Sequence, residues 1–278
     1  MERRKNRLFL KNLRREILTF YENKSTDEEI KEVIEYLKAN PVTVFPYDFK
    51  KKYSEDFIEV FTDKSNELKY VIHEDKRLYF KRSLSEEGIK KLYLGLQIDQ
   101  DIESPHLYLT KDFYLESHDV IADIGAAEGN FSLSNIEKVK KVYLFEYDQD
   151  WLEALRATFA PWRDKVEIID KYVSNVDSES TITMNTFFGQ NPDITFLKVD
   201  IEGSEAHFLE GFSEILDKDM QIKIALCTYH KQNDEEEFTK LLSNYGFKVV
   251  PSNGYMIFIY DKKINVPYLR RGLLRAMK

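Results

Sequence analysis

The chain has 278 residues, of which 42% are hydrophobic and 32% are charged, and its formal net charge is −8. This balance is typical of a soluble globular protein with one large or two modest domains. No apolar run is long enough to cross a bilayer, and no signal-peptide pattern opens the chain. The single cysteine, Cys227, excludes an internal disulfide and predicts a reducing, cytoplasmic location.

Charge is unevenly distributed along the chain. Residues 1–15 and residues 262–278 each carry a net charge of +6, which leaves −20 for the residues between them. An acidic body disfavours nucleic acid as a partner, because both would carry negative charge. The two basic ends allow a weak contact with an anionic surface. No pattern in the sequence indicates an oligomeric state.

The first 116 residues are predicted to form a smaller, mixed α+β region. Apolar spacing predicts a helix over 5–23. Thr26 with Glu29, and later Ser83 with Glu86, have the spacing of capping boxes that start two further helices. Asn40-Pro41 ends the first of these two. Short strands are expected over 57–61, 69–73 and 77–81.

From residue 119 the pattern becomes a regular alternation of strands and helices. Apolar strand-like runs lie at 120–124, 142–145, 166–169, 194–199 and 222–227, with helical segments at 131–136, 152–159, 208–216 and 238–245. This alternation predicts a doubly wound, mainly parallel α/β sheet over residues 117–262. Residues 248–250 and 255–260 predict an antiparallel C-terminal hairpin, and residues 263–278 are predicted to be a basic tail.

The most informative segment begins where a buried strand ends at Asp123. The turn that follows contains Gly125 and Gly129, and glycines permit positive φ and close approach of a ligand. A dinucleotide site would need Gly-x-Gly-x-x-Gly around a pyrophosphate. Here the carboxylates of Asp123 and Glu128 repel phosphate and favour a cationic ligand such as S-adenosylmethionine. The expected cofactor-binding residues of this segment are Asp123, Gly125, Ala126, Glu128, Gly129 and Phe131.

A second acidic position follows the next strand. The run 142–145 ends at Glu146, about 20 residues after the glycine turn, where an acidic residue hydrogen-bonds ribose hydroxyls in folds of this kind. Glu146 and the adjacent Tyr147 are therefore predicted to contact the cofactor.

A third segment places carboxylates around a glycine after the run 194–199. Asp200, Glu202 and Glu205 bracket Gly203 at the start of a helix. One interpretation is that they only interact with the helix dipole. The functional interpretation places Asp200 and Glu202 in the cleft beside the reactive methyl group, with Asp200 also contacting the cofactor.

Two histidines lie where they could reach the same edge of the sheet. His230 follows the run 222–227, and His106 precedes the predicted cofactor domain. We expect His230 to act as the general base, with Asp200 or Glu202 as alternatives. His106 and Glu205 are predicted to contact the acceptor. Spacing alone indicates no convergent set of metal ligands, so no metal site is predicted.

Together these segments resemble the FkbM family of methyltransferases, which mostly methylate hydroxyls on sugars and polyketides. Residues 123–131 match its D-x-G-A-x-x-G-x-[FY] segment, Phe145-Glu146 matches its F-E pair, and residues 198–205 match its K-x-D-x-E-G-x-E signature. The resemblance spans roughly residues 117–260. The chain departs from the family at Tyr147, where proline is usual, and at Asn185, where an acidic residue is common.

The resemblance implies a Rossmann-like methyltransferase fold that uses S-adenosylmethionine. It also implies O-methylation of a hydroxyl on a sugar, a glycan or another small metabolite, with residues 1–116 covering the cleft and selecting the acceptor. Two other functions stay open at this point. A nicotinamide-dependent oxidoreductase is disfavoured by the missing third glycine and by Glu128, and a non-catalytic nucleoside-cofactor-binding module is disfavoured by the intact acidic positions.

Overall fold

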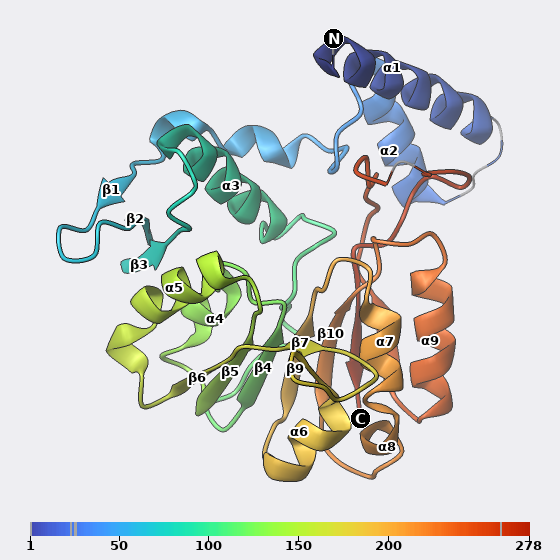
Figure 1. Ribbon diagram of the computed structural model, residues 1–278. Coiled ribbons are helices and arrows are strands. Elements are labelled where there is room, and N and C mark those ends of the chain that lie inside the picture. Colours follow the sequence, from blue (N-terminus) through green and yellow to red (C-terminus); the bar gives the residue numbers. More distant parts are fainter. Residues whose placement is uncertain (1, 23, 25–26, 262) are drawn as a thin grey trace.

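The computed structural model describes residues 2–22, 24, 27–261 and 263–278. Their largest sheet has seven strands in the order β11-β12-β10-β9-β4-β5-β6 (Figure 1). The strands are β4 (Val120–Ile124), β5 (Lys141–Phe145), β6 (Val166–Ile169), β9 (Phe196–Val199), β10 (Lys223–Cys227), β11 (Lys248–Pro251) and β12 (Leu273–Met277). The five neighbouring strands β10, β9, β4, β5 and β6 run parallel, whereas β12 runs antiparallel to both of its neighbours, β10 and β11. The predicted doubly wound, Rossmann-like α/β fold is confirmed.

Helices cover both faces of this sheet because alternate strand residues point to opposite sides. On one face Ile121, Val142 and Phe196 pack against α4 (Asn130–Asn135) and α5 (Gln149–Thr158). On the other face Ala122, Tyr143 and Leu197 pack against the second set of helices. That set comprises α6 (Met184–Gln190), α7 (Glu205–Glu210), α8 (Ser213–Leu216) and α9 (Asp234–Asn244). Strands buried on both faces explain the continuous apolar runs of the sequence.

The C-terminal strand pairing differs from the predicted hairpin. β11 pairs with β12, not with residues 255–260, where only Met256 forms an isolated bridge, to Arg270. Residues 263–278 are therefore not a tail, since β12 lies inside the sheet between β10 and β11. Its buried Arg275 donates hydrogen bonds to the carbonyl oxygens of Leu107 and Tyr108, which compensates burial of the charge.

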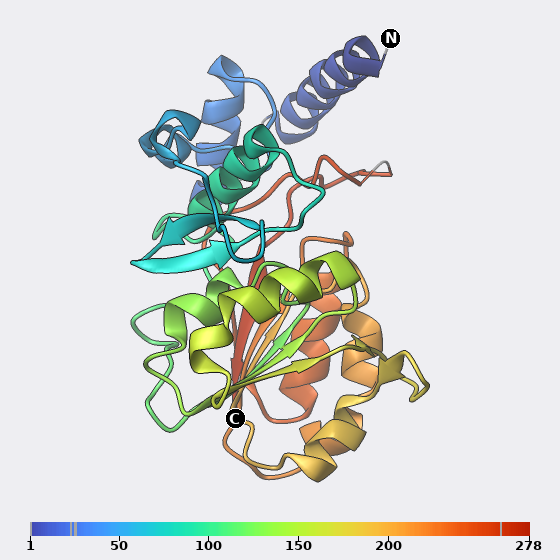
Figure 2. The same cartoon turned by 60° about the vertical axis from the view of Figure 1, so that its left-hand side comes forward.

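The N-terminal region lies over the carboxyl edge of the sheet (Figure 2). It contains α1 (Glu2–Tyr21), α2 (Glu28–Ala39), α3 (Glu86–Asp99) and a small sheet of β1 (Phe61–Thr62), β2 (Lys69–His73) and β3 (Lys76–Tyr79). Two short 3-10 helices, Phe49–Lys52 and Glu55–Phe57, precede this small sheet. Of the strand expected over 57–61, only Phe61 is in a strand, β1. None of the described helices has the length and apolar character needed to span a bilayer.

Helix starts in this region differ in detail from the predicted capping boxes. Asp27 caps α2, accepting from the backbone N–H groups of Glu29 and Ile30, whereas Thr26 lies outside the described residues. Ser85, not Ser83, caps α3 by accepting from the N–H of Gly88. Both caps satisfy N–H groups that a helix leaves without a partner at its first turn.

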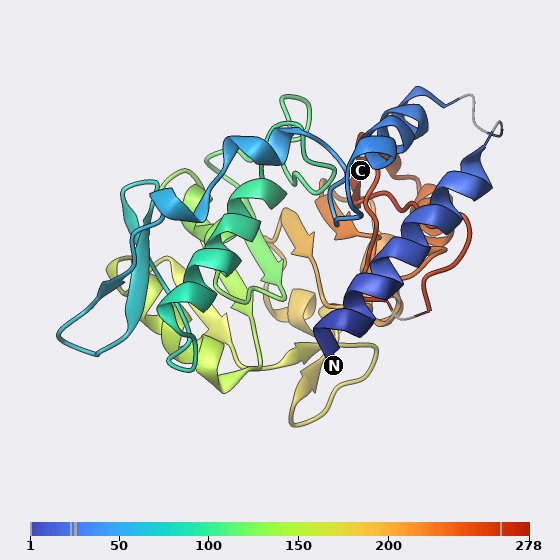
Figure 3. The same cartoon turned by 90° about the horizontal axis from the view of Figure 1, so that it is seen from above.

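Residues 255–261 and 263–270 return to α1 and α2, and α1 lies over this part of the chain in the view from above in Figure 3. Met256, Ile257 and Leu269 form one apolar cluster with residues of α1 and α2 such as Ile17 and Val33. An ion pair of 2.5 Å between Arg271 and Glu29 adds to this contact. This packing explains why residues 255–260 do not join the main sheet. After β6, the edge strand of the main sheet, β7 (Tyr172–Val173) and β8 (Thr181–Ile182) form a separate, short parallel pair that was not predicted.

Candidate functional site

A cavity of about 750 Å³ lies at the carboxyl edge of the parallel strands. The loops after β4, β5 and β9 form one part of its wall, and α3 with the loop that follows it forms another. Of the predicted cofactor-binding residues, those that line it are Gly125, Ala126, Glu128, Glu146, Tyr147 and Asp200. The lining does not include Asp123, Gly129 or Phe131, which support the wall from behind.

The turn after β4 requires glycine at two positions. Gly125 has φ of +76°, and a Cβ there would lie 2.0 Å from the carbonyl oxygen of Asp200. Gly129 has φ of +80°, precedes α4, and a Cβ there would meet Leu155 and Phe159 at 2.8 Å. Only glycine allows this backbone path without strain. The turn is thereby held close against β9 and α5, with its backbone at the cavity.

Glu146 holds the glycine turn in place. One carboxylate oxygen accepts from the backbone N–H of Ala127 at 2.9 Å, and the other accepts from those of Tyr147 and Asp148 at 2.8 Å. These three hydrogen bonds leave one lone pair, on the oxygen that accepts from Ala127, and the side chain lines the cavity, where a ligand hydroxyl could use it. Neighbouring Tyr147, where the family usually has proline, packs its ring 4.3 Å from that of Tyr172.

Asp123 lies beneath the turn and pairs with a buried lysine. Its Oδ1 lies 3.0 Å from Nζ of Lys198, and its Oδ2 accepts from the hydroxyl of Ser132 at 2.7 Å. Lys198 also donates to the carbonyl oxygen of Gly125 at 2.6 Å. Burial lowers the pKa of Lys198, but Asp123 and Asp200 outweigh this effect and hold the pKa above its usual value. The lysine therefore stays charged and ties β9 to the turn.

Two carboxyl groups face the cavity without a cationic partner of their own. Burial raises the pKa of Glu128 from 4.5 to about 7, and burial raises the pKa of Asp99, at the end of α3, to about 6. No side chain of the described chain forms an ion pair with either of them. The charged groups of the lining are mainly acidic: Asp99, Glu128, Glu146, Asp148, Asp200 and Glu202, against Lys171 and Lys198. Such a wall favours a ligand that carries positive charge.

Asp200 is the central polar residue of the site. Its Oδ2 accepts from the hydroxyl of Tyr108 at 3.0 Å, and its Oδ1 accepts from the hydroxyl of Tyr229 at 3.1 Å. Burial raises its pKa, but hydrogen bonding and charge from His106, together with the charges of Lys198 and His230, outweigh burial and hold the pKa well below its usual range. Asp200 is therefore an ionised carboxylate, with Oδ2 hydrogen-bonded to Tyr108 and Oδ1 hydrogen-bonded to Tyr229.

His230 lies behind Asp200, not in the cavity wall. Its side chain is 4% exposed, and its Nε2 lies 3.6 Å from both Asp200 Oδ1 and Glu202 Oε2. Its Nδ1 lies 2.9 Å from Oε1 of the fully buried Glu205. Burial lowers the pKa of His230, but the carboxylates of Glu205, Asp200 and Glu202 raise it above its usual value. Glu205, predicted to contact the acceptor, instead accepts from the N–H of Ile201.

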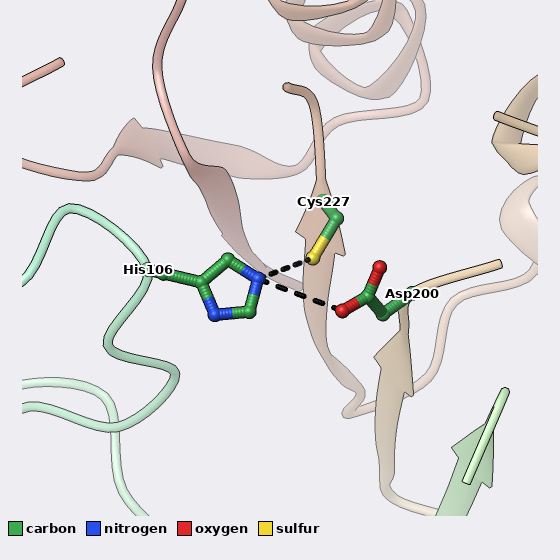
Figure 4. Close-up of side chains that lie close together, drawn as sticks. All are labelled: His106, Asp200 and Cys227. Atoms are coloured by element: carbon green, nitrogen blue, oxygen red, sulfur yellow. Dashed lines mark hydrogen bonds and ion pairs between the residues drawn. The ribbon is translucent and has the colours of Figure 1, made fainter. Parts of the chain in front are cut away.

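His106 reaches the other side of Asp200. Its Nε2 lies 3.5 Å from Asp200 Oδ2 and 3.5 Å from Sγ of Cys227, as Figure 4 shows. His106 and Asp200 line the cavity, whereas Cys227 is fully buried at the end of β10. Burial raises the pKa of the Cys227 thiol.

Several residues of the site were missed by the sequence analysis. Tyr108 and Tyr229 each follow or precede a predicted histidine by one or two positions, yet a tyrosine gives no pattern of its own. Arg270 donates to the carbonyl oxygens of Tyr229 and His230 at 2.8 Å and so holds their loop. Its position in a basic run predicted a solvated side chain, and only the tertiary fold buries it.

A family model described as a methyltransferase FkbM domain matches residues 54–249. The matched region therefore includes β1–β3 and α3, which lie before the region of resemblance seen in the sequence. No curated protein matches the chain.

Solved structures with a similar fold include several methyltransferases. Methyltransferase FkbM from Methylobacillus flagellatus KT is 16% identical, with a TM-score of 0.46 over 71% of this chain and 56% of that chain. Precorrin-6y C5,15-methyltransferase from Geobacter metallireducens GS-15 is 12% identical, with a TM-score of 0.39 over 72% and 94%. A putative methyltransferase from Streptococcus mutans in complex with SAH is 17% identical, with a TM-score of 0.36 over 59% and 90%. The chain thus spans just over half the length of the M. flagellatus protein.

Proposed function

The chain belongs to the FkbM methyltransferase family, whose cofactor is S-adenosylmethionine, and on this premise we propose that it methylates a hydroxyl of a sugar, a glycan or another small metabolite. The observation that carries the proposal is the acidic cavity beside the glycine turn. Its volume of about 750 Å³ falls within the range of small-molecule sites.

The residues present fit this cofactor. Glu128 and Asp99 present carboxyl groups without cationic partners, which suits a ligand with a sulfonium and an ammonium group. Glu146 lines the cavity at the end of β5 and retains one lone pair for a ribose hydroxyl. Gly125 and Ala126 would hold the ligand through close backbone approach. The other requirement is an acceptor surface, and α3 with the loop around His106 supplies one.

S-adenosylmethionine, when bound, supplies a methyl carbon already activated by the sulfonium. The protein must align the acceptor, exclude water and take the hydroxyl proton. Asp200 is the carboxylate of the wall that can accept that proton, because an oxygen that gains a methyl group becomes a strong acid. A carboxylate with a low pKa is therefore basic enough. Its tyrosine partners fix its direction.

His230 is assigned a positioning role in this proposal, in place of the general base expected from the sequence. It does not line the cavity and contacts Asp200 Oδ1 at 3.6 Å. His230 lies among the carboxylates of Asp200, Glu202 and Glu205, which favour its imidazolium form. This positive charge would keep Asp200 ionised and fix the orientation of its side chain. Glu202 remains at the rim, with a side chain that is 88% exposed.

The test is a methyl-donor consumption assay against a library of glycans and small hydroxyl compounds. We expect S-adenosylhomocysteine to form together with a product in which one methyl group replaces the hydroxyl proton of the acceptor. Asp200→Asn should form neither at the wild-type rate, while Tyr260→Ala, at an exposed position outside the cavity, should behave like wild type. Cofactor binding without methylation of any acceptor would favour a binding module. A melting-temperature shift with a nicotinamide dinucleotide and none with S-adenosylhomocysteine would favour an oxidoreductase.

A further inference from the structure

Three different metal-ligand side chains converge at the inner end of the cavity. Asp200 follows the last residue of β9, and Cys227 ends β10, one position beyond the paired residues Val199 and Leu226. Parallel pairing therefore sets the carboxylate and the thiol side by side. His106 arrives from the loop after α3 and points its Nε2 between them (Figure 4). The histidine and the cysteine are 121 positions apart in the sequence.

The separations of His106 Nε2 from its two neighbours are those of ligands around one small cation. Nε2 of His106 lies 3.5 Å from Oδ2 of Asp200 and 3.5 Å from Sγ of Cys227, and all three atoms lie within 4.8 Å of one another. Around tetrahedral zinc, bonds of about 2.0–2.1 Å to nitrogen or oxygen and about 2.3 Å to sulfur separate neighbouring ligands by roughly 3.3–3.6 Å. The two separations from His106 therefore already match those of neighbouring zinc ligands, and the carboxylate and the thiol lie close enough to reach the same ion.

We propose that His106 Nε2, Asp200 Oδ2 and Cys227 Sγ form a three-residue binding site for Zn²⁺. The donor set selects this class of metal, because thiolate and imidazole suit zinc, whereas magnesium and calcium require oxygen ligands. Binding releases the proton of the Cys227 thiol and any proton on Nε2 of His106, so that a thiolate, a neutral imidazole and a carboxylate coordinate the metal. One thiolate and one carboxylate balance the two positive charges, so the occupied centre is neutral.

The surroundings of the site agree with this assignment. Asp200 keeps its other oxygen for Tyr229 and His230, so metal binding at Oδ2 leaves the positioning contact intact. Tyr108 donates to Oδ2 and would orient the ligand carboxylate from a second layer. A second group of possible ligands, Asp200, Glu205 and His230, also lies within 4.8 Å. It is the weaker choice, because Glu205 already accepts from a backbone N–H and neither Glu205 nor His230 faces the cavity.

Three protein ligands leave a fourth position of a tetrahedral zinc open. His106 and Asp200 line the cavity and Cys227 lies beneath them, so the open position faces the cavity. An acceptor hydroxyl oxygen fits there, and zinc would make its proton easier to transfer to Oδ1 of Asp200, the oxygen that the metal leaves free. This last step rests on the proposed methyltransferase function, whereas binding of the metal does not.

The experiment uses the full chain after chelator treatment, titrated with Zn²⁺ and separately with Co²⁺ as a spectroscopic probe. We expect one equivalent of either metal and a near-ultraviolet thiolate-to-Co²⁺ absorption band. Cys227→Ser should remove the band, and both Cys227→Ser and His106→Gln should weaken zinc binding by at least about a hundredfold. The control His118→Gln, at an exposed histidine that does not line the cavity, should bind as wild type does. Circular dichroism and thermal melting confirm that each variant is folded.

Two results would overturn the metal site. One is folded wild-type protein that binds no zinc. The other is Co²⁺ that binds without a thiolate band, or that binds to the Cys227 and His106 variants as tightly as to wild type. Titration of the same metal-free protein with S-adenosylhomocysteine separates the two proposals. If the protein binds S-adenosylhomocysteine but no metal, only the zinc proposal is contradicted. If it shows the thiolate band with Co²⁺ but binds no S-adenosylhomocysteine, only the proposed function is contradicted.

Discussion

The carboxylate of Glu146 accepts a hydrogen bond from the backbone N–H of Ala127 at 2.9 Å and so joins the end of β5 to the glycine turn. The same side chain faces the cavity. Glu146 therefore has two roles in the proposed cofactor site: it shapes the turn, and it offers its remaining lone pair to a ligand hydroxyl. Replacing it should affect cofactor binding through both.

Glu146→Ala should weaken binding of S-adenosylhomocysteine by roughly 1–3 kcal/mol, the scale of a lost hydrogen bond to a charged group. Isothermal titration calorimetry measures the change. Glu146→Gln keeps one oxygen acceptor and should lose less affinity than the alanine variant. Equal affinity in wild type and Glu146→Ala would remove Glu146 from the cofactor site.

Glu128→Gln should stabilise the ligand-free protein at pH 8. The pKa of Glu128 is raised from 4.5 to about 7, so the folded chain holds a proton that the unfolded chain releases between these values. The free energy of unfolding therefore falls as pH rises through this window, and the full cost is present above pH 7. Removing the charge should recover roughly 1–3 kcal/mol at pH 8 and little at pH 4.

Urea unfolding at both pH values tests this expectation, with Glu137→Gln at an exposed position as the control. The same substitution should weaken S-adenosylhomocysteine binding at pH 8, because the cavity loses a negative charge that faces a cationic ligand. A variant that is no more stable than wild type at pH 8 would show that burial does not penalise this carboxylate.

Lys198→Met should destabilise the fold by about 3–5 kcal/mol, because it leaves Asp123 buried without its cation. Adding Asp123→Asn to this variant should recover part of the loss, since the uncompensated charge is then removed. Urea unfolding of the two single variants and the double variant gives the coupling energy. Strict additivity would mean that the 3.0 Å pair contributes no interaction of its own.

His230→Ala should lower kcat at least tenfold with the acceptor identified by the library screen, while KM for the cofactor changes less than about threefold. The reason is that His230 orients the side chain of Asp200 but does not itself line the cavity where the cofactor would bind. His230→Gln keeps a polar group and should recover part of the rate. A loss of cofactor affinity equal to the loss of kcat would indicate general misfolding of the loop instead of a positioning role.

Local patterns in the sequence were sufficient for the parallel sheet and for much of the cofactor wall. β4 coincides with the predicted run 120–124, since a strand buried on both faces must be apolar throughout. Gly125 and Glu146 could be located because a positive φ and a strand-end carboxylate each leave a signature at one position. The placement of Glu128 and Asp200 in the cavity wall follows from the same rule, that parallel strands end at a common edge.

Only the tertiary structure decided which distant residues meet. β12 was interpreted as part of a basic tail because the segment around it is rich in lysine and arginine. The partners of its arginines are carbonyl oxygens and carboxylates elsewhere in the chain, which no local pattern reveals. His106, Asp200 and Cys227 likewise come together from three separate elements. Sequence periodicity reports how one segment buries its own side chains, whereas the contacts between segments depend on strand order and loop path, which are set by the folding of the whole chain.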